Sequence, residues 1–326
     1  MKAVIYTRYG PPEVLSVGEI ERPCPGQDEV LIEVHAAEAT KADCELRSFK
    51  FAVKWFWLPL RLVVGITRPR RRVLGNYFSG IVVEAGSNVT RLSIGDAVFG
   101  SAGFVRGAYG EYMTVPESCP VITKPTNMSF EEAAAVPLGG LNAIHFMRLA
   151  EIQSGETVLV NGAGGSIGAH GVQIAKAYGA QVTAVDASHK ETMLRRIGAD
   201  HFVDYTRENF AERGQTYDVI FDMVAGSSYS ACIRSLNPGG RYLKANPRLS
   251  DMLRAPWTSR FSDKTVRVAI ARETQEELEA LKSMIENGHI QSIVDTVYSI
   301  TEAPEAHRRV ETEQRSGAIV LKISAT

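Results

Sequence analysis

The sequence has few cysteines and no surplus of charge of either sign, and each shortage excludes a class of protein. The cysteines lie far apart and form no Cys-x-x-Cys pair: Cys24, Cys44, Cys119 and Cys232. This spacing gives neither a zinc ribbon nor a disulfide framework, and it favours reduced thiols and a cytoplasmic location. A formal net charge of −1 leaves no basic excess for binding nucleic acid.

A long uninterrupted apolar run is also missing. The opening residues, MKAVIYTRYG, contain no hydrophobic region of a signal peptide. The stretch at 49–66 is apolar and aromatic, but Lys54, Pro59 and Arg61 make it a poor spanning helix. The residues after it include Arg68, Arg70, Arg71 and Arg72. We expect this stretch to close a substrate cleft or cover a subunit contact; alternatively, its tryptophans and arginines suit a membrane surface.

Length and strand pattern predict two domains. At 326 residues the chain is long for a single hydrophobic core. In its first part, up to about residue 125, short β-branched stretches alternate with turns that contain glycine or proline. This pattern predicts a small, barrel-like β domain, with its clearest strands at 30–34, 81–83 and 97–99.

Strands and helices alternate in the rest of the chain. A capping box formed by Ser129 and Glu132 opens a helical stretch. The alternation predicts a doubly wound parallel sheet, with strands at 157–160, 182–185, 201–203, 219–221, 240–243 and 266–270. From Thr274 an amphipathic helix runs to about Gly288, and a last strand at 318–323 is expected to rejoin the first domain.

The most informative segment is one strand–turn–helix–strand unit at 153–186. Its first strand runs into a turn of small residues, Gly179 ends the helix that follows, and the second strand ends at Asp186. A dinucleotide-binding unit has about 30 residues, with an acidic residue about 20 positions after its glycines. The first N–H groups of the helix have no partner inside the helix, and a pyrophosphate can accept them. The segment therefore predicts a dinucleotide site.

The spacing of the small residues fixes the register of this turn. Ala163, Gly165 and Gly168 fit the Gly-x-Gly-x-x-Gly spacing, with alanine in the first place. Ala163 serves the tight turn, Gly165 lets the backbone approach the phosphates, and Gly168 permits close packing of helix on strand. The hydroxyl of Ser166 either contacts the pyrophosphate or is merely tolerated at the helix start. The predicted cofactor contacts in the turn are Ala163, Gly164, Gly165, Ser166, Ile167 and Gly168.

A series of short motifs spans nearly the whole chain: residues 2–6, 47–48, 73–75, 80–86, 95–100, 110–112, 133–143, 163–168, 197–200, 217–222 and 238–241. With these motifs in this order, the chain resembles the medium-chain dehydrogenase/reductase superfamily, in its zinc-free, quinone-oxidoreductase-like branch. The resemblance implies an α/β fold in which a split GroES-like β-barrel domain accompanies a Rossmann domain, with catalysis in the cleft between them. We place the GroES-like domain at 1–125, completed by 271–326, and the Rossmann domain at 126–270.

The resemblance also identifies metal ligands that this chain lacks. Alcohol-dehydrogenase relatives hold a catalytic Zn²⁺ with a cysteine and a Gly-His-Glu motif. The corresponding positions here are Thr40 and the run Gly75, Asn76 and Tyr77. A catalytic zinc site needs about three converging protein ligands, and no other cluster of His, Cys and Asp in the sequence replaces them. We therefore expect no metal.

The loss of zinc changes the expected chemistry. Without a Lewis acid an alcohol is hard to ionise at neutral pH. Hydride transfer from a reduced nicotinamide to a quinone or an α,β-unsaturated carbonyl stays available, because hydrogen bonds can hold the developing oxyanion. Zinc-free relatives carry out this reaction with an Asn-Pro-x-Asp-x-Tyr motif, which reads TKADCE at 40–45 here, without the Asn and the Tyr. The candidate donors that remain are Thr40, Lys41 and Tyr77.

The predicted cofactor contacts outside the turn give conflicting signals on NADH and NADPH. Asp186 can accept hydrogen bonds from both hydroxyls of an unphosphorylated ribose. It would repel a 2′-phosphate, because two like unit charges ~4 Å apart repel each other by about 4 kcal/mol at an effective dielectric constant of ~20. Lys190 and Tyr205, however, match residues that flank this phosphate in NADPH-dependent relatives. We favour NADH slightly and leave the use of both open. Asn142 and Val224 are expected beside the nicotinamide end.

The leading hypothesis is a zinc-independent NAD(P)H-dependent oxidoreductase that transfers hydride to a quinone, enone or other activated carbonyl. Two alternatives stay open. One is a metal-free reductase or dehydrogenase of an aldehyde or a biosynthetic intermediate. The other is a catalytically lapsed nucleotide-binding protein with a sensing or membrane-associated role. The expected partners are a small electrophilic substrate and, from the resemblance, further copies of the chain in a homodimer or homotetramer.

Overall fold

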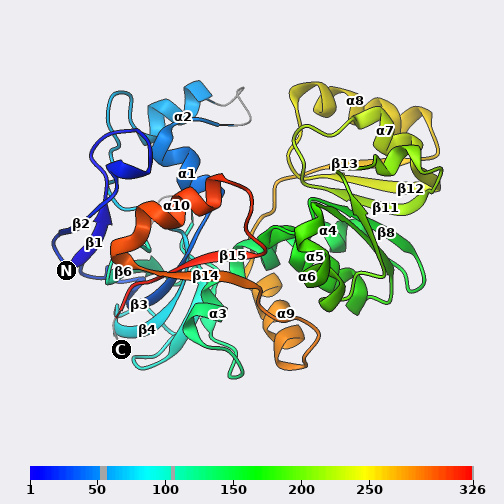
Figure 1. The fold of residues 1–326 in the computed structure, drawn as a ribbon. Helices are drawn as coiled ribbons and strands as arrows, with labels where there is room; N and C mark the ends of the chain where they lie inside the picture. The colour runs from blue at the N-terminus through cyan, green and yellow to red at the C-terminus, as the bar shows by residue number, and fades with distance from the viewer. Residues whose placement is uncertain (52–56, 104–106, 325–326) are drawn as a thin grey trace. The chain divides into compact units, whose positions relative to one another are not determined.

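The computed structural model describes residues 1–51, 57–103 and 107–324, with the backbone alone at 57–59. The chain folds into two compact units (Figure 1). The first comprises Met1–Leu138, Glu273–Asn287 and Ser292–Thr326, and the second comprises Gly139–Arg272 and Gly288–Gln291. The first unit is therefore built from both ends of the chain.

A seven-stranded sheet organises the first unit, in the order β14-β15-β3-β4-β5-β7 with β6 paired to β3. Its strands are β3 (Glu29–Ala39), β4 (Tyr77–Ala85), β5 (Ala97–Ser101), β6 (Tyr112–Pro116), β7 (Val121–Thr123), β14 (Val294–Ser299) and β15 (Ala318–Lys322). The strands predicted at 30–34, 81–83 and 97–99 lie within β3, β4 and β5. β15 pairs antiparallel with β3, so the last strand rejoins the first domain as predicted. A hairpin of β1 (Lys2–Ile5) and β2 (Ser16–Glu19) belongs to the same unit.

Two helices of the first unit, α3 (Phe130–Ala134) and α9 (Gln275–Glu286), begin where the sequence predicts. The unit also contains α1 (Lys41–Ser48), α2 (Trp57–Val64) and α10 (Ala303–Glu311). At α3 the hydroxyl of Ser129 accepts the N–H of Glu132 at 3.1 Å, and the Glu132 carboxylate accepts the N–H of Ser129 at 2.8 Å. Thr274 and Glu277 form the same capping box at α9. Both predicted helix starts are confirmed.

The second unit is a six-stranded parallel sheet in the order β10-β9-β8-β11-β12-β13. Its strands are β8 (Thr157–Asn161), β9 (Gln181–Asp186), β10 (His201–Asp204), β11 (Tyr217–Asp222), β12 (Leu236–Lys244) and β13 (Thr265–Val268). Its helices are α4 (Pro137–Ala150), α5 (Ser166–Ala177), α6 (Glu191–Arg196), α7 (Tyr229–Arg234) and α8 (Leu249–Phe261). This strand order is that of the Rossmann fold, with its switch point between β8 and β11. All six predicted strands are present.

Each unit buries its own apolar core. In the first unit Ile32, Phe78 and Val98 come from three neighbouring strands and are fully buried. In the second unit Leu159 and Ile220 come from the neighbouring strands β8 and β11 and are also fully buried. Burying one such side chain contributes about 1.5–3 kcal/mol, so the cores fix the strand ends at which the candidate sites lie.

Only part of the apolar stretch at 49–66 can be described. Residues 52–56, with Trp55 among them, lie outside the described residues, so the membrane-surface alternative stays a prediction. The described part contains α2, which is eight residues long. Among the helices of the described chain, none has both the length and the apolar character that crossing a bilayer requires.

Candidate active site

Glycines shape the turn between β8 and α5. Gly162 has a φ of +85°, a conformation that favours glycine. A Cβ at Gly168 would lie 2.3 Å from the carbonyl oxygen of Gly162 and 2.6 Å from the Cα of Ala163. Position 168 therefore accepts only glycine, and the helix packs on the turn as closely as the spacing of the small residues predicts.

The start of α5 is open. Gly165 is the N-cap and provides no side-chain cap, and a Cβ at this position would meet no described heavy atom within 4 Å. The hydroxyl of Ser166 is buried, yet it has no hydrogen-bond partner among the described residues. Because buried polar atoms are nearly always paired, an open helix start with a spare hydroxyl fits an anionic group such as a pyrophosphate.

His170 packs one turn further along α5. Its Nδ1 lies 2.8 Å from the carbonyl oxygen of Ser166. Burial lowers the pKa of His170, so the imidazole is neutral at pH 7 and Nδ1 donates its hydrogen to this carbonyl. A Cβ at Gly139 would lie 2.4 Å from Nδ1, which shows how closely α4 packs against the turn. The sequence carries no signal for this contact, because only folding brings positions 139 and 170 together.

Asp186 ends β9 beside the turn and accepts hydrogen bonds from three sides. Its Oδ2 accepts the N–H of Gly164 at 2.7 Å, and its Oδ1 accepts the N–H of Ala187 at 2.8 Å. The ammonium group of Lys190 lies 3.0 Å from Oδ1, and both side chains are buried. Tyr205 is 62% exposed, and its backbone N–H donates to the carbonyl oxygen of Asp186. The structure thus brings Asp186 and Lys190 together as an ion pair.

A buried polar cluster lies at the carboxyl ends of β8, β11 and β12. The Asp222 carboxylate is fully buried and lies 2.8 Å from the ammonium group of Lys244. Asn161 donates to it at 2.9 Å and Tyr242 at 2.7 Å. Such a pair is stable in the interior only when further hydrogen bonds satisfy it. Lys244 also donates to the carbonyl oxygen of Val224 at 2.7 Å, so the pair holds the loop that carries this predicted cofactor contact. Sequence reasoning missed Lys244 and Asn161.

All the predicted cofactor contacts lie in the second unit. Ala163 is fully buried in the turn, Ile167 is half-buried in the first turn of α5, and Asn142 is half-buried on α4. Val224 follows β11 and is 40% exposed. What these residues do toward a cofactor stays a prediction.

The three predicted donors lie in the first unit, and each has a partner of its own. Thr40 is the N-cap of α1. Lys41 is exposed and forms an ion pair with Glu313. The hydroxyl of Tyr77 donates to the Glu273 carboxylate at 2.6 Å, and burial, more than this carboxylate, raises the pKa of Tyr77. Tyr77 is therefore protonated at neutral pH.

Asp43 closes the start of α1. Its Oδ2 accepts hydrogen bonds from the Thr40 hydroxyl at 2.6 Å and from Tyr109 at 3.2 Å, and its Oδ1 accepts the N–H of Gly75 at 3.0 Å. The N–H of Thr40 also donates to Oδ2, at 3.1 Å. Burial raises the pKa of Asp43, although these donors act in the opposite direction. Both oxygens of this carboxylate accept hydrogen bonds, and the group of Thr40, Asp43, Gly75 and Tyr109 is called the saturated cluster below.

His307 extends the saturated cluster toward α10. Arg47 lies 3.2 Å from its Nδ1 and Tyr109 lies 3.3 Å from its Nε2. A guanidinium only donates, so Nδ1 accepts and Nε2 carries the hydrogen that points to Tyr109. Burial, and then Arg47, lower the pKa of His307 to about 3. Burial raises the pKa of the neighbouring Cys44 thiol, so this cysteine is unreactive.

Comparison with known proteins points to one superfamily. Residues 26–126 match the alcohol dehydrogenase GroES-like domain and residues 197–321 match the zinc-binding dehydrogenase family. The chain is 31% identical to 2-methylene-furan-3-one reductase of Solanum lycopersicum, across 98% of this chain and 79% of that protein. It is 30% identical to the chloroplastic NADPH-dependent alkenal/one oxidoreductase of Arabidopsis thaliana, with the same coverage. The quinone oxidoreductase from Coxiella burnetii has the same fold, with a TM-score of 0.87 at 27% identity over 99% of both chains.

The chain belongs to the medium-chain dehydrogenase/reductase superfamily, in its quinone-oxidoreductase-like branch. It is an oxidoreductase that acts on a small molecule, in a family that uses NAD(P)H. The family and the fold class predicted from the sequence motifs, a Rossmann sheet with a GroES-like domain, are both confirmed.

This member of the superfamily differs from alcohol dehydrogenases at the positions expected for zinc ligands. Thr40 caps α1, and Asn76 follows Gly75, whose N–H is bonded to Asp43. Within the described parts of the chain, no group of three or more His, Cys, Asp or Glu side chains is placed to hold a metal ion. The family matched at 197–321 is described as zinc-binding dehydrogenase, and zinc independence of this chain stays a prediction.

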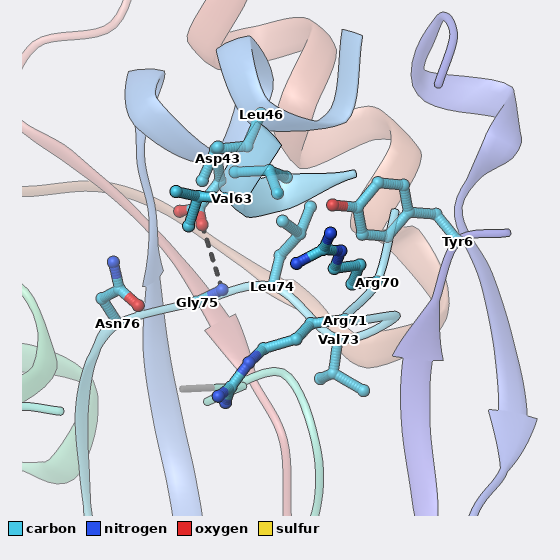
Figure 2. Close-up of a pocket in the computed structure, with 11 residues that line it drawn as sticks. Tyr6, Asp43, Leu46, Val63, Arg70, Arg71, Val73, Leu74, Gly75 and Asn76 are labelled. Carbon is cyan, nitrogen blue, oxygen red and sulfur yellow. Dashed lines mark hydrogen bonds between the residues drawn. The ribbon is translucent and has the colours of Figure 1, made fainter. Parts of the chain in front are cut away.

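A small pocket of about 250 Å³ lies in the first unit, beside Asp43 (Figure 2). Its lining comes from the residue after β1, from α1 and α2, and from the segment that leads into β4: Tyr6, Asp43, Leu46, Val63, Val64, Arg70, Arg71, Val73, Leu74, Gly75 and Asn76. One lining residue is Asn76, which the family resemblance places at the position of the histidine in the Gly-His-Glu motif.

Proposed function

We propose that this chain is a zinc-independent, NAD(P)H-dependent oxidoreductase that transfers hydride to a quinone, an enone or another activated carbonyl. The observation that carries the proposal is the open start of α5, where Gly165 offers no side chain and the buried Ser166 hydroxyl has no partner in the described chain. The names of the Solanum and Arabidopsis relatives, a 2-methylene-furan-3-one reductase and an alkenal/one oxidoreductase, support an acceptor with an activated double bond.

Residues of the second unit have separate tasks toward the cofactor, which supplies the hydride when bound. The N–H groups at the start of α5 and the Ser166 hydroxyl hold the diphosphate. Asp186 accepts the hydroxyls of the adenosine ribose. Asn142 and Val224 contact the nicotinamide end, and the buried pair of Asp222 and Lys244 keeps the Val224 loop in place.

An acceptor that is already electrophilic suits a site without zinc. Its oxygen gains charge as hydride arrives, and positioned hydrogen-bond donors stabilise that charge. We assign this role to Thr40, Lys41 and Tyr77, and each of them must give up its present partner to reach the substrate: Asp43, Glu313 and Glu273 in turn. Tyr77 begins the reaction protonated, and it must exchange its hydrogen bond to Glu273 for one to the substrate.

We propose that the enzyme prefers NADH. The buried ion pair between Asp186 and Lys190 compensates the lysine charge, which leaves less of it for a 2′-phosphate. A Michaelis constant for NADPH about ten times that for NADH is expected, and Asp186→Ser should narrow the difference by releasing Lys190. A hundredfold preference of the unmodified enzyme for NADPH would contradict this assignment.

The test of the proposed function is cofactor oxidation with a panel of quinones and enones, in the presence of a metal chelator. We expect turnover that the chelator does not reduce. Calorimetry on the same preparation measures cofactor binding independently. Cofactor binding without turnover of any acceptor, or turnover that requires one equivalent of zinc, would show that the proposal is wrong.

We also propose that the chain forms a homodimer through the second unit. β13 is an edge strand of the described sheet, and α8, which packs against it, exposes an apolar stripe of Leu249, Leu253, Trp257 and Phe261. Such patches mark interaction surfaces, and an edge strand can pair with its own copy about a twofold axis. Light scattering should report a dimer that Trp257→Glu dissociates; a monomeric unmodified protein would refute this.

A further inference from the structure

The pocket of the first unit has mainly apolar walls. Five of its lining residues are aliphatic: Leu46, Val63, Val64, Val73 and Leu74. At about 250 Å³ the pocket is smaller than the roughly 300–1,000 Å³ of a pocket for a drug-sized ligand. It therefore suits a small molecule or one end of a larger one.

The charged residues of the lining do not define the ligand. Both oxygens of Asp43 already accept hydrogen bonds within the saturated cluster. Arg71 already has a partner in the structure. Arg70 is exposed, and exposed ion pairs contribute little to binding. An uncharged ligand is thus the better match for these walls.

Tyr6 brings a hydroxyl group into the pocket. The residue is 2% exposed, and Figure 2 shows its hydroxyl directed inward among the other lining residues. The backbone N–H of Tyr6 donates to Arg72, but its hydroxyl has no hydrogen-bond partner among the residues that the structure describes. The hydroxyls of Tyr9 and Tyr109, in contrast, each donate to an acceptor. Because buried polar groups are nearly always paired, the hydroxyl of Tyr6 indicates a ligand.

The phenol of Tyr6 is a hydrogen-bond donor at neutral pH. Burial, more than any neighbouring charge, raises its pKa, so the proton stays on the oxygen. Thr40, Lys41 and Tyr77 must each give up a partner before they reach a ligand. Tyr6 loses no existing hydrogen bond when it donates to a ligand oxygen.

The pocket also adjoins two of these donors. Asp43 lines it and accepts the Thr40 hydroxyl at 2.6 Å, and Asn76 lines it and directly precedes Tyr77 in the chain. A molecule in the pocket therefore lies on the acceptor side of the proposed site.

We propose that this pocket receives the carbonyl end of an uncharged acceptor and that the Tyr6 hydroxyl donates a hydrogen bond to the carbonyl oxygen. The inference rests on the proposed function, because it adds a catalytic residue to that reaction and names the acceptor class: small, uncharged enones and quinones with an apolar ring. The acceptor carbon takes hydride from the reduced nicotinamide, the π electrons move to the carbonyl oxygen, and the resulting oxyanion takes a proton from water. Tyr6 stabilises the charge that develops on this oxygen.

The test is the variant Tyr6→Phe, assayed with 2-cyclohexenone and 1,4-naphthoquinone. The kcat/KM should fall about a hundredfold, mainly through kcat, because the lost hydrogen bond acts in the transition state. Tyr112→Phe is the matched control: it removes a phenol hydroxyl of the same unit, from a half-buried ring that contacts Arg22 outside the pocket, and should keep kcat/KM. The melting temperature of Tyr6→Phe should stay the same or rise, since an unpaired hydroxyl leaves the interior.

Three results would overturn the proposal: an unchanged kcat/KM in Tyr6→Phe, an equal loss in Tyr112→Phe, or a clear fall in the melting temperature of Tyr6→Phe, which would reveal a structural partner. If no acceptor is reduced, the proposed function fails, and the pocket is tested separately with 2-cyclohexenone in the absence of cofactor. Infrared spectra should then show a lower carbonyl stretching frequency for the ketone bound to the unmodified protein than for the ketone bound to Tyr6→Phe. Equal frequencies, or no binding to the unmodified protein, would refute the hydrogen bond itself.

Discussion

Helices α1 and α5 each follow a strand closely, α1 after β3 and α5 after β8, but their first turns are completed differently. At α1 the Thr40 hydroxyl accepts the N–H of Asp43 and the Asp43 carboxylate accepts the N–H of Thr40. At α5 the N-cap is Gly165, and the Ser166 hydroxyl lacks a partner within the described chain. The N–H groups at a helix start need a cap, water or a ligand. The difference separates a helix start that stabilises the fold from one that is left for a ligand.

The largest effect on stability is expected at the saturated cluster, where His307 contacts Tyr109 and Tyr109 donates to Asp43 in the cap of α1. The pKa of His307 is about 3 in the folded protein, against about 6.5 in the unfolded chain. The unfolded chain therefore takes up the proton first. The stability that neutral His307 contributes is present above about pH 6.5 and is lost toward pH 3, by about 1.4 kcal/mol per pH unit.

The variant His307→Gln should flatten this part of the pH dependence between about pH 6 and pH 4, measured as the free energy of unfolding in urea. His289→Gln is the control, since His289 is exposed. Equal slopes for His307→Gln and the unmodified protein would show that His307 is not coupled to folding.

The next largest effect on stability is expected at Gly168, in the first turn of α5. Gly168→Ala places a Cβ 2.3 Å from the carbonyl oxygen of Gly162, and this carbonyl cannot move without disturbing the turn. Overpacking of this kind costs about 1–3 kcal/mol. We expect a lower melting temperature together with loss of cofactor binding by calorimetry. A variant that keeps both would disprove the close packing described for the turn.

A smaller loss of stability is expected when the side-chain cap of α1 is removed. Thr40→Val keeps the shape of the side chain but removes the hydroxyl that caps α1, which should cost about 0.5–2 kcal/mol in thermal unfolding. Thr40→Ser retains the hydroxyl and should recover most of the stability. If valine and serine behaved alike, the cap would have no energetic role.

The smallest change in stability is expected at Gly165. A Cβ there meets no described atom within 4 Å and the backbone is extended, so Gly165→Ala should alter the unfolding free energy by less than about 0.5 kcal/mol. It should nevertheless weaken cofactor binding about tenfold, because the methyl group occupies the space left for the diphosphate. Ser166→Ala should weaken it less. Unchanged affinity in both variants would remove the basis for assigning this site.

Local sequence patterns predict the start of α5, but they do not predict the cluster at the start of α1. The turn at 162–168 and the capping boxes at Ser129 and Thr274 each lie within a few residues, so spacing alone predicts them. The cluster of Asp43, Tyr109 and His307 joins positions 43, 109 and 307, which only the folded sheet brings together. Hydrophobic periodicity carries no information on such pairs.

Two further residues show the same limit. Lys244 pairs with Asp222 because β11 and β12 are neighbours in register, and the sequence alone does not indicate which lysine reaches a given carboxylate. The position of a family motif predicts Lys41 as a cleft donor, yet its ammonium group pairs with Glu313, a residue far along the chain. Motif position predicts the backbone location and not the partner of the side chain.

The contact of Gly164 with the Asp186 pair has an evolutionary consequence. A Cβ at Gly164 would lie 2.3 Å from the Cδ of Lys190 and 2.9 Å from the Asp186 Oδ2. Glycine at this position lets both side chains keep the places that form the ion pair. In lineages that acquire a side chain at position 164 the lysine and the aspartate have to shift or be replaced, so the three positions are expected to change together as the enzyme moves between coenzymes.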